Sequence, residues 1–345
     1  MPKLIIQIPC LNEADTLPAT LAALPREIDG IDTIETLVID DGSTDDTVAV
    51  ARRCGVEHIV HFTSHRGLAR GFAAGLDACL HLGADVIVHT DADGQYPGED
   101  VPKLVAPILR GEADMVVGDR GVDAVAHFSP LKRLLQRFGS QAVSALSRIE
   151  VDDVTSGFRA YSREAALRLN ILTNFTYTLE TIMQSGEKPI TIVSVPTRSN
   201  PPTRPSRLFT GIGQYLRRQI PTILRLFWVY QPLKTFTIVA AAFLTPGLIL
   251  GVRFLYFYIF GAGAGHIQSL ILAAVLLIVG FQMQILGLVA DLLAANRRLM
   301  EDTLYRVRKI ELMSLSQVNV EATAGELHGD GPETEDANAG VEPER

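Results

Sequence analysis

The sequence predicts an α/β domain with a mostly parallel sheet, followed by two membrane-spanning helices. Residues 1 to about 200 alternate short β-branched runs with segments whose apolar residues recur at helical spacing, a pattern typical of alternating strands and helices. Residues 235–252 and 254–290 contain no charged side chain, and about 20 apolar residues suffice to cross a bilayer. A chain of 345 residues is also long enough to bury a sizeable core.

The α/β region holds the predicted strands and helices in alternation. Strands are expected at residues 3–8, 35–39, 58–62, 85–89, 114–117 and 191–195. Helices are expected at residues 13–24, 45–54, 67–81, 100–109 and 131–146. Ligands of such sheets lie beyond the carboxyl ends of the parallel strands, so the residues that follow each strand are the first candidates for a site.

The composition changes along the chain predict several segments. We expect a globular domain at 1–205, an amphipathic juxtamembrane helix at 206–232, membrane spans at 233–259 and 267–290, a basic cytoplasmic helix at 291–312 and an acidic disordered tail at 313–345. The alternative for the two spans is a pair of buried helices in a soluble core. The juxtamembrane helix is expected either on the membrane surface or packed on the globular domain.

The basic residues flanking the two spans predict the orientation. Arginines and lysines both precede the first span and follow the second, which places both flanks in the cytoplasm. The protein is therefore expected to be a multi-pass cell-membrane protein with a cytoplasmic globular domain. Gly247 and Gly251 are spaced for close helix contact, which would permit a homo-oligomer.

Charge and cysteine content exclude some function classes. The net charge of −8 resides mostly in the tail, where eight acidic residues oppose Arg345 alone from Met313 onward. No basic stripe remains to indicate nucleic-acid binding. The three cysteines are far apart in the sequence, so neither a disulfide framework nor a zinc site is expected. The first residues also lack the long apolar run of a signal peptide.

Polar residues follow three of the predicted strands, in the segments 9–13, 40–43 and 91–95. If the strands are parallel, these segments gather at one edge of the sheet. Asp91 and Asp93 offer oxygen ligands for Mg²⁺ or Mn²⁺, which bind through one or two carboxylates and the phosphates of a substrate. Gln95 can add a neutral oxygen. The alternative for this segment is a solvated turn.

The other two segments suit a nucleotide. Asp40 and Asp41 end a strand, and Asp41 is the better candidate to contact a base or ribose. Asn12 and Glu13 are expected to begin a helix, where capping is their alternative role. Pro9 would set the direction of the chain at this point.

Six motifs together resemble one enzyme family. They are PCLNE at 9–13, VIDDGSTDDT at 38–47, HRGLARG at 65–71, DADGQYP at 91–97, VVGDR at 116–120 and DVTSGFRAYSR at 153–163. In order and spacing, residues 3 to about 210 resemble the inverting family-2 glycosyltransferases, and most of all the dolichyl- or polyprenyl-phosphate sugar synthases. The resemblance implies a GT-A fold, an NDP-sugar donor such as GDP-mannose or UDP-glucose, and a divalent metal held by the Asp-x-Asp sequence.

The resemblance also implies residue roles. The nucleotide would be held by Pro9, Asn12, Glu13, Asp40, Asp41 and Asp91. The metal and diphosphate would meet Asp91, Asp93 and Gln95. Catalysis would use Asp93, Arg120, Arg204 and Arg207. The sugar and acceptor side would include Ser156, Gly157, Phe158, Arg159 and Arg133.

Some of these roles have alternatives within the sequence. Phe158 and Arg159 are equally compatible with shaping the pocket, and Arg133 with the solvated face of a helix. Asp119 stands where the family has a serine, and the glycine that the family carries in its juxtamembrane segment is missing here. Arg204 and Arg207 are the candidates to bind phosphate, because guanidinium groups suit phosphate oxygens. The missing glycine lies in the same segment and makes their assignment there less specific.

The acceptor is expected to be a polyprenyl or dolichyl phosphate in the bilayer. A sugar hydroxyl needs a general base to remove its proton, whereas a lipid phosphate is already an oxyanion. The alternative acceptor is a lipid hydroxyl, for which Glu180, Asp152 or Asp153 would be the base. A second alternative is a membrane-anchored scaffold with a decayed site, against which the intact Asp91, Asp93 and Gln95 argue.

Overall fold

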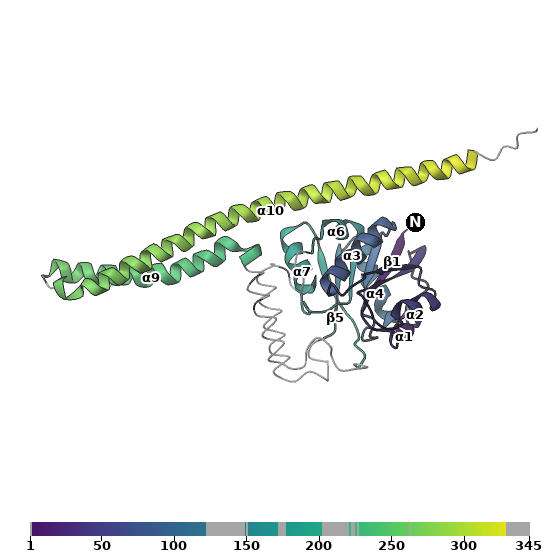
Figure 1. Ribbon diagram of the computed structural model, residues 1–345, viewed down its shortest axis with the longest axis horizontal. Coiled ribbons are helices and arrows are strands. Elements are labelled where there is room, and N and C mark those ends of the chain that lie inside the picture. The colour runs from purple at the N-terminus through teal and green to yellow at the C-terminus, as the bar shows by residue number, and fades with distance from the viewer. Residues whose placement is uncertain are drawn as a thin grey trace, which may run out of the picture.

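The computed structural model describes residues 2–121, 149, 151–171, 177–201, 221, 225, 228–261 and 263–328. A sheet covered by helices on both faces forms the globular part, and two long helices extend from it (Figure 1). The predicted α/β class and the two apolar C-terminal helices are confirmed. The predicted helix at 131–146 and most of the predicted segment 206–232 lie outside the described residues.

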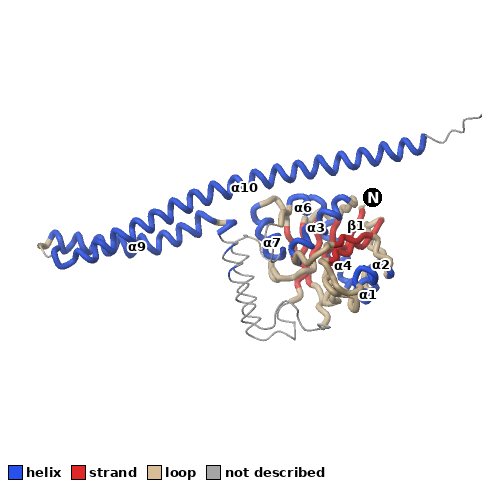
Figure 2. Tube along the Cα trace, in the orientation of Figure 1, coloured by secondary structure: helices blue, strands red, loops and turns tan. Residues whose placement is uncertain are grey.

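The sheet has seven strands, which Figure 2 shows gathered at the centre of the globular part. They are β1 (Lys3–Cys10), β2 (Thr33–Asp40), β3 (His58–His61), β4 (Val86–His89), β5 (Met115–Asp119), β6 (Arg159–Ser162) and β7 (Ile192–Pro196). Their order is β3-β2-β1-β4-β6-β5-β7. All neighbouring pairs are parallel except those of β6, which runs antiparallel to both β4 and β5. The sequence patterns predicted every strand except β6.

The helices cover the two faces of the sheet. One hydrophobic cluster is shared by the helices α1 (Leu17–Ala22), α2 (Thr47–Arg53) and α4 (Val101–Leu109). The other cluster is shared by α3 (Leu68–His81), α6 (Arg163–Arg168) and α7 (Tyr177–Glu187). A short 3₁₀ turn, η1 (Gly98–Asp100), precedes α4. Successive side chains of a strand point to opposite faces, so Leu4 and Ile6 pack in the first cluster and Ile5 in the second. Burial of both faces explains the continuous apolar runs of the strands.

The helices α9 (Pro232–Ile259) and α10 (Ile267–His328) form an antiparallel pair joined by the turn η2 (Gly263–His266) (Figure 1). Glycines allow their close approach: a Cβ added at Gly280 would lie 2.6 Å from Leu244, and one at Gly287 would lie 2.7 Å from Phe236. Gly247 faces Leu276 of the same chain, whereas Gly251 has open space around it. Both helices contain an 18-residue stretch apolar enough to cross a membrane, with mean hydropathies of 2.0 in α9 and 2.3 in the Ile267–Ser314 part of α10.

The helix α10 is much longer than a membrane span. It continues unbroken past positions 290 and 312, where the sequence predicts segment boundaries, and its later part runs beside the globular part (Figure 1). Leu312 of α10 and Tyr230, just before α9, are 9% and 6% exposed and belong to the hydrophobic cluster of α3, α6 and α7. The hairpin is therefore packed against the globular part at both of its ends. Residues 329–345 of the predicted tail lie outside the described residues.

Candidate active site

The sheet topology brings the predicted polar segments to one edge. The carboxyl ends of β1, β2 and β4 lie together because these strands are parallel, with Cys10 beside Asp40. The antiparallel β6 begins at the same edge, since its first residue, Arg159, pairs with His89 of β4 and Val117 of β5. The segment before β6 is thereby delivered to the edge from a distant part of the sequence.

Asn12 and Glu13 join the end of β1 to the segment after β2. Asn12 adopts a positive φ of 56°, which few residues other than glycine tolerate. Its backbone N–H donates to Ser43 Oγ (2.8 Å), and its Oδ1 accepts from the backbone N–H of Thr44 (2.8 Å). Glu13 N donates to Thr47 Oγ1 (2.9 Å). These bonds fix the two segments to each other at the sheet edge.

Asp40 and Asp41 are both buried and both engaged. Asp40 Oδ2 lies 2.7 Å from His61 Nδ1, and its Oδ1 accepts from the backbone N–H of Ser43 (3.2 Å). Asp41 accepts from the backbone N–H groups of Arg66 (2.6 Å) and Gly67 (2.9 Å). In this structure Asp41 therefore holds the segment that leads into α3. Pro9 lies at the end of β1, next to these residues.

The segment Asp91–Gln95 follows β4 directly. Burial, together with the nearby Asp93 carboxylate, raises the pKa of Asp91 to about 7. Asp93 Oδ1 accepts from the backbone N–H of Gln95 (3.1 Å), which orders the turn. Two carboxylates held this close would be stabilised by a cation, and a hard divalent ion suits their oxygens.

Further protein ligands for a metal are few in this region. Among the residues that the structure describes, no group of three or more His, Cys, Asp or Glu side chains is placed to hold a metal ion. The donor set at this edge thus consists of Asp91 and Asp93, with Gln95 beside them. Such a set fits Mg²⁺ or Mn²⁺ when the phosphates of a substrate complete the coordination.

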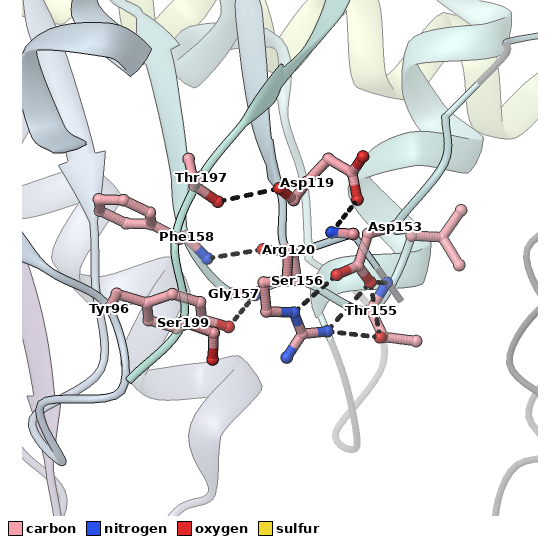
Figure 3. A network of polar contacts seen from close by, with 12 residues as sticks. Tyr96, Asp119, Arg120, Asp153, Thr155, Ser156, Gly157, Phe158, Thr197 and Ser199 are labelled. Atoms are coloured by element: carbon pink, nitrogen blue, oxygen red, sulfur yellow. Dashed lines mark hydrogen bonds and ion pairs between the residues drawn. The ribbon is translucent and has the colours of Figure 1, made fainter. Parts of the chain in front are cut away.

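Arg120 is placed at the same edge by the end of β5 (Figure 3). Its Nε donates to Asp153 Oδ2 (2.6 Å), and its Nη2 donates to Asp153 Oδ1 (3.0 Å) and Thr155 Oγ1 (3.0 Å). The Asp153 side chain is fully buried and that of Arg120 is 14% exposed. Burial alone would raise the pKa of Asp153, but the adjacent Arg120 guanidinium holds that pKa below its usual range.

The segment between Asp153 and Arg159 packs closely on the Asp91 carboxylate. A Cβ added at Gly157 would lie 3.1 Å from the Tyr177 hydroxyl and 3.3 Å from Asp91 Oδ2. Gly157 N donates to the Tyr96 hydroxyl (3.1 Å), as Figure 3 shows. Tyr96 and Tyr177 thus border the site, although the sequence patterns did not single out either one. Tyr96 could have been found because it directly follows Gln95.

Ser156, Phe158 and Arg159 are all fully buried. Phe158 stacks on Tyr96 with ring centroids 5.1 Å apart. The Arg159 guanidinium donates to the carbonyls of Val154 and Ser156 (both 2.8 Å) and, on α7, to the carbonyl of Thr178 (2.8 Å). In this structure Arg159 orders the 153–158 segment and ties it to α7.

Three of the predicted basic residues cannot be placed at the site, and the nearby Arg198 pairs with acidic side chains. Arg133, Arg204 and Arg207 lie outside the described residues. Arg198 is bound to the buried Asp100 (2.9 Å) and the exposed Glu99 (2.9 Å). The segment that contains it lies over the Asp91–Gln95 turn, because Asn200 N donates to Gln95 O (2.9 Å) and Asn200 Nδ2 to Gly94 O (2.9 Å).

The fold and the acidic edge define an α/β protein built like the GT-A glycosyltransferases. The structure of glucosyl-3-phosphoglycerate synthase from Mycobacterium tuberculosis, in complex with Mn²⁺, UDP and glucosyl-3-phosphoglycerate, superimposes with a TM-score of 0.51 at 22% identity and covers 66% of this chain and 79% of that one. This likeness shows the shared fold. The model of the glycosyl transferase family 2 matches residues 5–169, and the chain belongs to that family.

Relatives within the family include two mannosyl-transferring enzymes. The polyprenol monophosphomannose synthase of Mycolicibacterium smegmatis is 31% identical over 176 residues, which are 49% of this chain and 65% of that one. The undecaprenyl-phosphate mannosyltransferase of Micrococcus luteus is 30% identical over 175 residues, 49% of this chain and 70% of that one. Glycosyltransferase AglJ of Haloferax volcanii is 27% identical and covers 89% of this chain. This chain is thus a family-2 glycosyltransferase that resembles polyprenyl-phosphate mannose synthases.

Proposed function

We propose that the protein transfers a hexose from an NDP-sugar to a polyprenyl or dolichyl phosphate, with inversion at the anomeric carbon. The observation that carries this proposal is that the two carboxylates that could hold a metal, Asp91 and Asp93, lie at the same sheet edge as the partly buried Arg120, whose charge acts on Asp91. A sugar diphosphate matches this arrangement, because its oxygens are attracted both to a cation held by the carboxylates and to the guanidinium. The names of two relatives, a polyprenol monophosphomannose synthase and an undecaprenyl-phosphate mannosyltransferase, support a hexose as the transferred group and a polyprenyl phosphate as the acceptor.

The nucleotide would lie at the ends of β1 and β2. Asn12, Glu13 and Asp41 surround this position, and Pro9 sets the direction of the chain as it leaves β1. Arg120 binds Asp153 and Thr155 through Nε and Nη2. Its Nη1 is therefore the nitrogen best placed to meet a phosphate oxygen. Arg204 and Arg207 are proposed to meet the acceptor phosphate.

The reaction requires no proton transfer from the acceptor. An oxygen of the lipid phosphate attacks the anomeric carbon from the face opposite the leaving group. The bond from that carbon to the diphosphate oxygen breaks, and the NDP leaves with the electron pair. A bound Mg²⁺ or Mn²⁺ would neutralise the charge that develops on the diphosphate.

Two of the three carboxylates that could act as a base for a hydroxyl acceptor, Asp153 and Glu180, are poorly suited to that role. Asp153 is held ionised by Arg120 with a lowered pKa, and a strongly stabilised carboxylate takes up a proton weakly. Glu180 lies on α7 with 1% of its surface exposed. Both observations favour an acceptor that is already an oxyanion.

Orientation follows from the charge flanking the hairpin. We propose that α9 and the first part of α10 span the cell membrane and that the globular domain lies in the cytoplasm, since basic residues flank both spans. The acceptor phosphate would then reach the site from the inner leaflet. Contacts between copies of the hairpin would give a homo-oligomer.

A donor and acceptor screen tests the proposal. The full-length protein in lipid vesicles would be given radiolabelled GDP-mannose or UDP-glucose with either polyprenyl phosphate or diacylglycerol, in the presence of Mg²⁺ or Mn²⁺. Product with polyprenyl phosphate is expected. Product with diacylglycerol alone would indicate that the acceptor is a lipid hydroxyl. An absence of product with every pair would indicate a membrane-anchored scaffold without enzymatic activity.

A variant of Asp93 tests the metal assignment. Asp93→Asn is expected to lower turnover by about a hundredfold or more, the effect of losing one group that stabilises developing charge. Asp77→Asn is the control, because Asp77 is an exposed carboxylate on α3. Equal activity of the two variants would exclude Asp93 from the metal site.

A further inference from the structure

The later part of α10 is joined to the globular domain by a partly buried ion pair. Lys188, directly after α7, lies with its Nζ 3.0 Å from Glu301 Oε2, and the two side chains are 15% and 11% exposed. The Lys188 ammonium also donates to Arg168 O (2.6 Å) and Gln184 Oε1 (2.8 Å). Three partners on three segments fix this ammonium in one place.

Contacts further along α10 continue this interface. The Tyr305 hydroxyl donates to Glu164 Oε1 of α6 (2.6 Å). Arg308 Nη1 donates to Leu169 O (3.1 Å) and Asn170 Oδ1 (3.0 Å). Leu312 then enters the hydrophobic cluster of the domain. We call residues 297–312 of α10 the strut.

The chain that enters the hairpin is held at the same place. Tyr230, immediately before α9, is 6% exposed. The Arg297 guanidinium of the strut lies 4.4 Å from the centre of its ring, and Arg297 Nη2 lies 3.5 Å from Glu187 Oε2 at the end of α7. The segment before α9 and the strut that follows the hairpin are therefore in contact with each other and with α7.

The strut is rigidly connected to the predicted span. Because α10 has no break between residues 267 and 328, the eleven residue steps from position 290 to position 301 set a separation of about 16 Å along the axis. A loop at this point would allow many separations, whereas a continuous helix allows one.

The helix α7 leads from this interface to the active site. Its last residue, Glu187, borders the strut, and its first residue, Tyr177, borders Gly157 and Asp91. The strut and the site are therefore joined through one helix, so the position of the strut relative to the bilayer sets the position of the site.

We propose that Lys188 and Glu301 are positioning residues that hold the active site at one height and orientation above the bilayer, so that a membrane-embedded lipid phosphate can reach it. The proposal rests on the proposed function in that the hairpin spans the bilayer and the acceptor is a lipid. Burying two charges costs desolvation free energy, and buried pairs can be retained for conformational specificity rather than for stability. Here the specific conformation would keep the active site at a fixed height above the bilayer, because a lipid phosphate is confined to the membrane surface.

The height can be measured without any reaction. Cys54 is exposed, whereas Cys10 and Cys79 are buried, so a maleimide fluorophore can be attached at Cys54 of the full-length protein in vesicles that carry an acceptor dye in their headgroups. Glu301→Lys places a positive charge beside Lys188 and Arg297, which repels both of them. This variant is therefore expected to change the energy-transfer efficiency and to broaden its distribution. Asp302→Lys is the matched control, because Asp302 is an exposed neighbour whose carboxylate pairs with Arg306 on the same helix.

A conservative variant separates positioning from damage to the fold. Glu301→Gln keeps a side-chain oxygen that can accept a hydrogen bond from the Lys188 ammonium and adds no positive charge beside Arg297, so it is expected to shift the energy transfer less than Glu301→Lys does. An unchanged signal in Glu301→Lys, or a larger shift in Glu301→Gln than in Glu301→Lys, would overturn the proposal.

The acceptor dependence gives a second readout. For Glu301→Lys, kcat/KM for a long-chain polyprenyl phosphate in vesicles is expected to fall by about tenfold or more, the order of effect of misplaced reactants. With a short-chain, water-soluble prenyl phosphate the rate is expected to stay within about twofold. Equal losses with both acceptors would overturn the positioning role. If the wild type used neither acceptor, the proposed function would fail while the energy-transfer result still decided the positioning.

Discussion

Arg120 and Asp153 lie 33 positions apart in the sequence and form a bidentate ion pair, with Nε–Oδ2 and Nη2–Oδ1 distances of 2.6 and 3.0 Å. The pair joins the end of β5 to the segment before β6, and it orients the guanidinium beside the Asp91 carboxylate. Because guanidinium and carboxylate match as two planar forks, the pair fixes the direction of Arg120 as well as its charge.

Asp153→Asn is expected to destabilise the protein by about 3 to 5 kcal/mol, because removal of one partner leaves a buried charge uncompensated. Chemical unfolding in detergent would measure the difference. Asp152→Asn is the control: its side chain is exposed, so its effect should stay within about 0.5 kcal/mol. Similar stabilities of the two variants would show that Arg120 does not depend on Asp153.

The stability of the 197–200 segment should depend on pH through Asp100. Burial alone would raise the pKa of this carboxyl, but hydrogen bonds from Arg198 and Lys103 lower it to about 2. Because the folded-state pKa lies below the ordinary value of 3.8, the stabilisation is present above pH 4 and is lost as the pH falls towards 2.

Asp100→Asn is accordingly expected to cost roughly 2 kcal/mol at pH 7 and progressively less below pH 4. Unfolding midpoints at pH 7 and pH 3 would measure this convergence. Glu99→Gln should behave like the wild type at both values, because the Glu99 side chain is 76% exposed. A deficit of Asp100→Asn that does not change with pH would contradict the assignment.

Gly157→Ala is expected to weaken the binding of Mn²⁺ with donor by about tenfold. The added methyl group would crowd the Tyr177 hydroxyl and Asp91 Oδ2, which lie 3.1 and 3.3 Å from it, and overpacking costs about 1 to 3 kcal/mol. Calorimetric titration would measure the affinity. In Gly71→Ala the nearest contact is 3.7 Å, to Ile39, so wild-type affinity is expected there; equal affinities in both variants would show that the site tolerates the methyl group.

Asn12 offers a test that separates backbone conformation from hydrogen bonding. Asn12→Gly keeps the positive φ at no steric cost but loses the bond to Thr44, whereas Asn12→Ala loses the bond and adds strain of about 1 to 2 kcal/mol. The expected order of stability is wild type, then glycine, then alanine, as measured by thermal unfolding. An alanine variant as stable as the glycine variant would indicate that the segment changes its conformation.

The strand ends were predictable because each has a local signature. An apolar run followed by Asp, Asn or Gly marks the exit from a buried strand, which located the Asp91–Gln95 turn and the Asp40–Asp41 pair. By contrast, β6 has the sequence Arg-Ala-Tyr-Ser and lacks a β-branched run. Its neighbours in the sheet, not its composition, determine that it is a strand.

Contacts between distant segments could not be predicted. Nothing near Arg120 in the sequence indicates Asp153 as its partner, and nothing near Gly157 indicates the Tyr177 hydroxyl. The Arg159 guanidinium is fully buried on backbone carbonyls, an arrangement rare enough for arginine that composition argues against it. The resemblance of motifs identified the right segment, and only the structure separates its exposed residues from its buried ones.

The insertion of β6 between β4 and β5 has a consequence for synthesis on the ribosome. The strand β5 pairs only with β6 and β7, so it has no neighbour until residues 159–162 have emerged. The first four strands can assemble early, but β5 must wait for a segment about forty residues downstream, and with it Arg120 must wait for Asp153. A nascent chain that stops before residue 162 therefore exposes an unpaired apolar strand, which makes the second half of the domain the stage at which chaperone protection matters most.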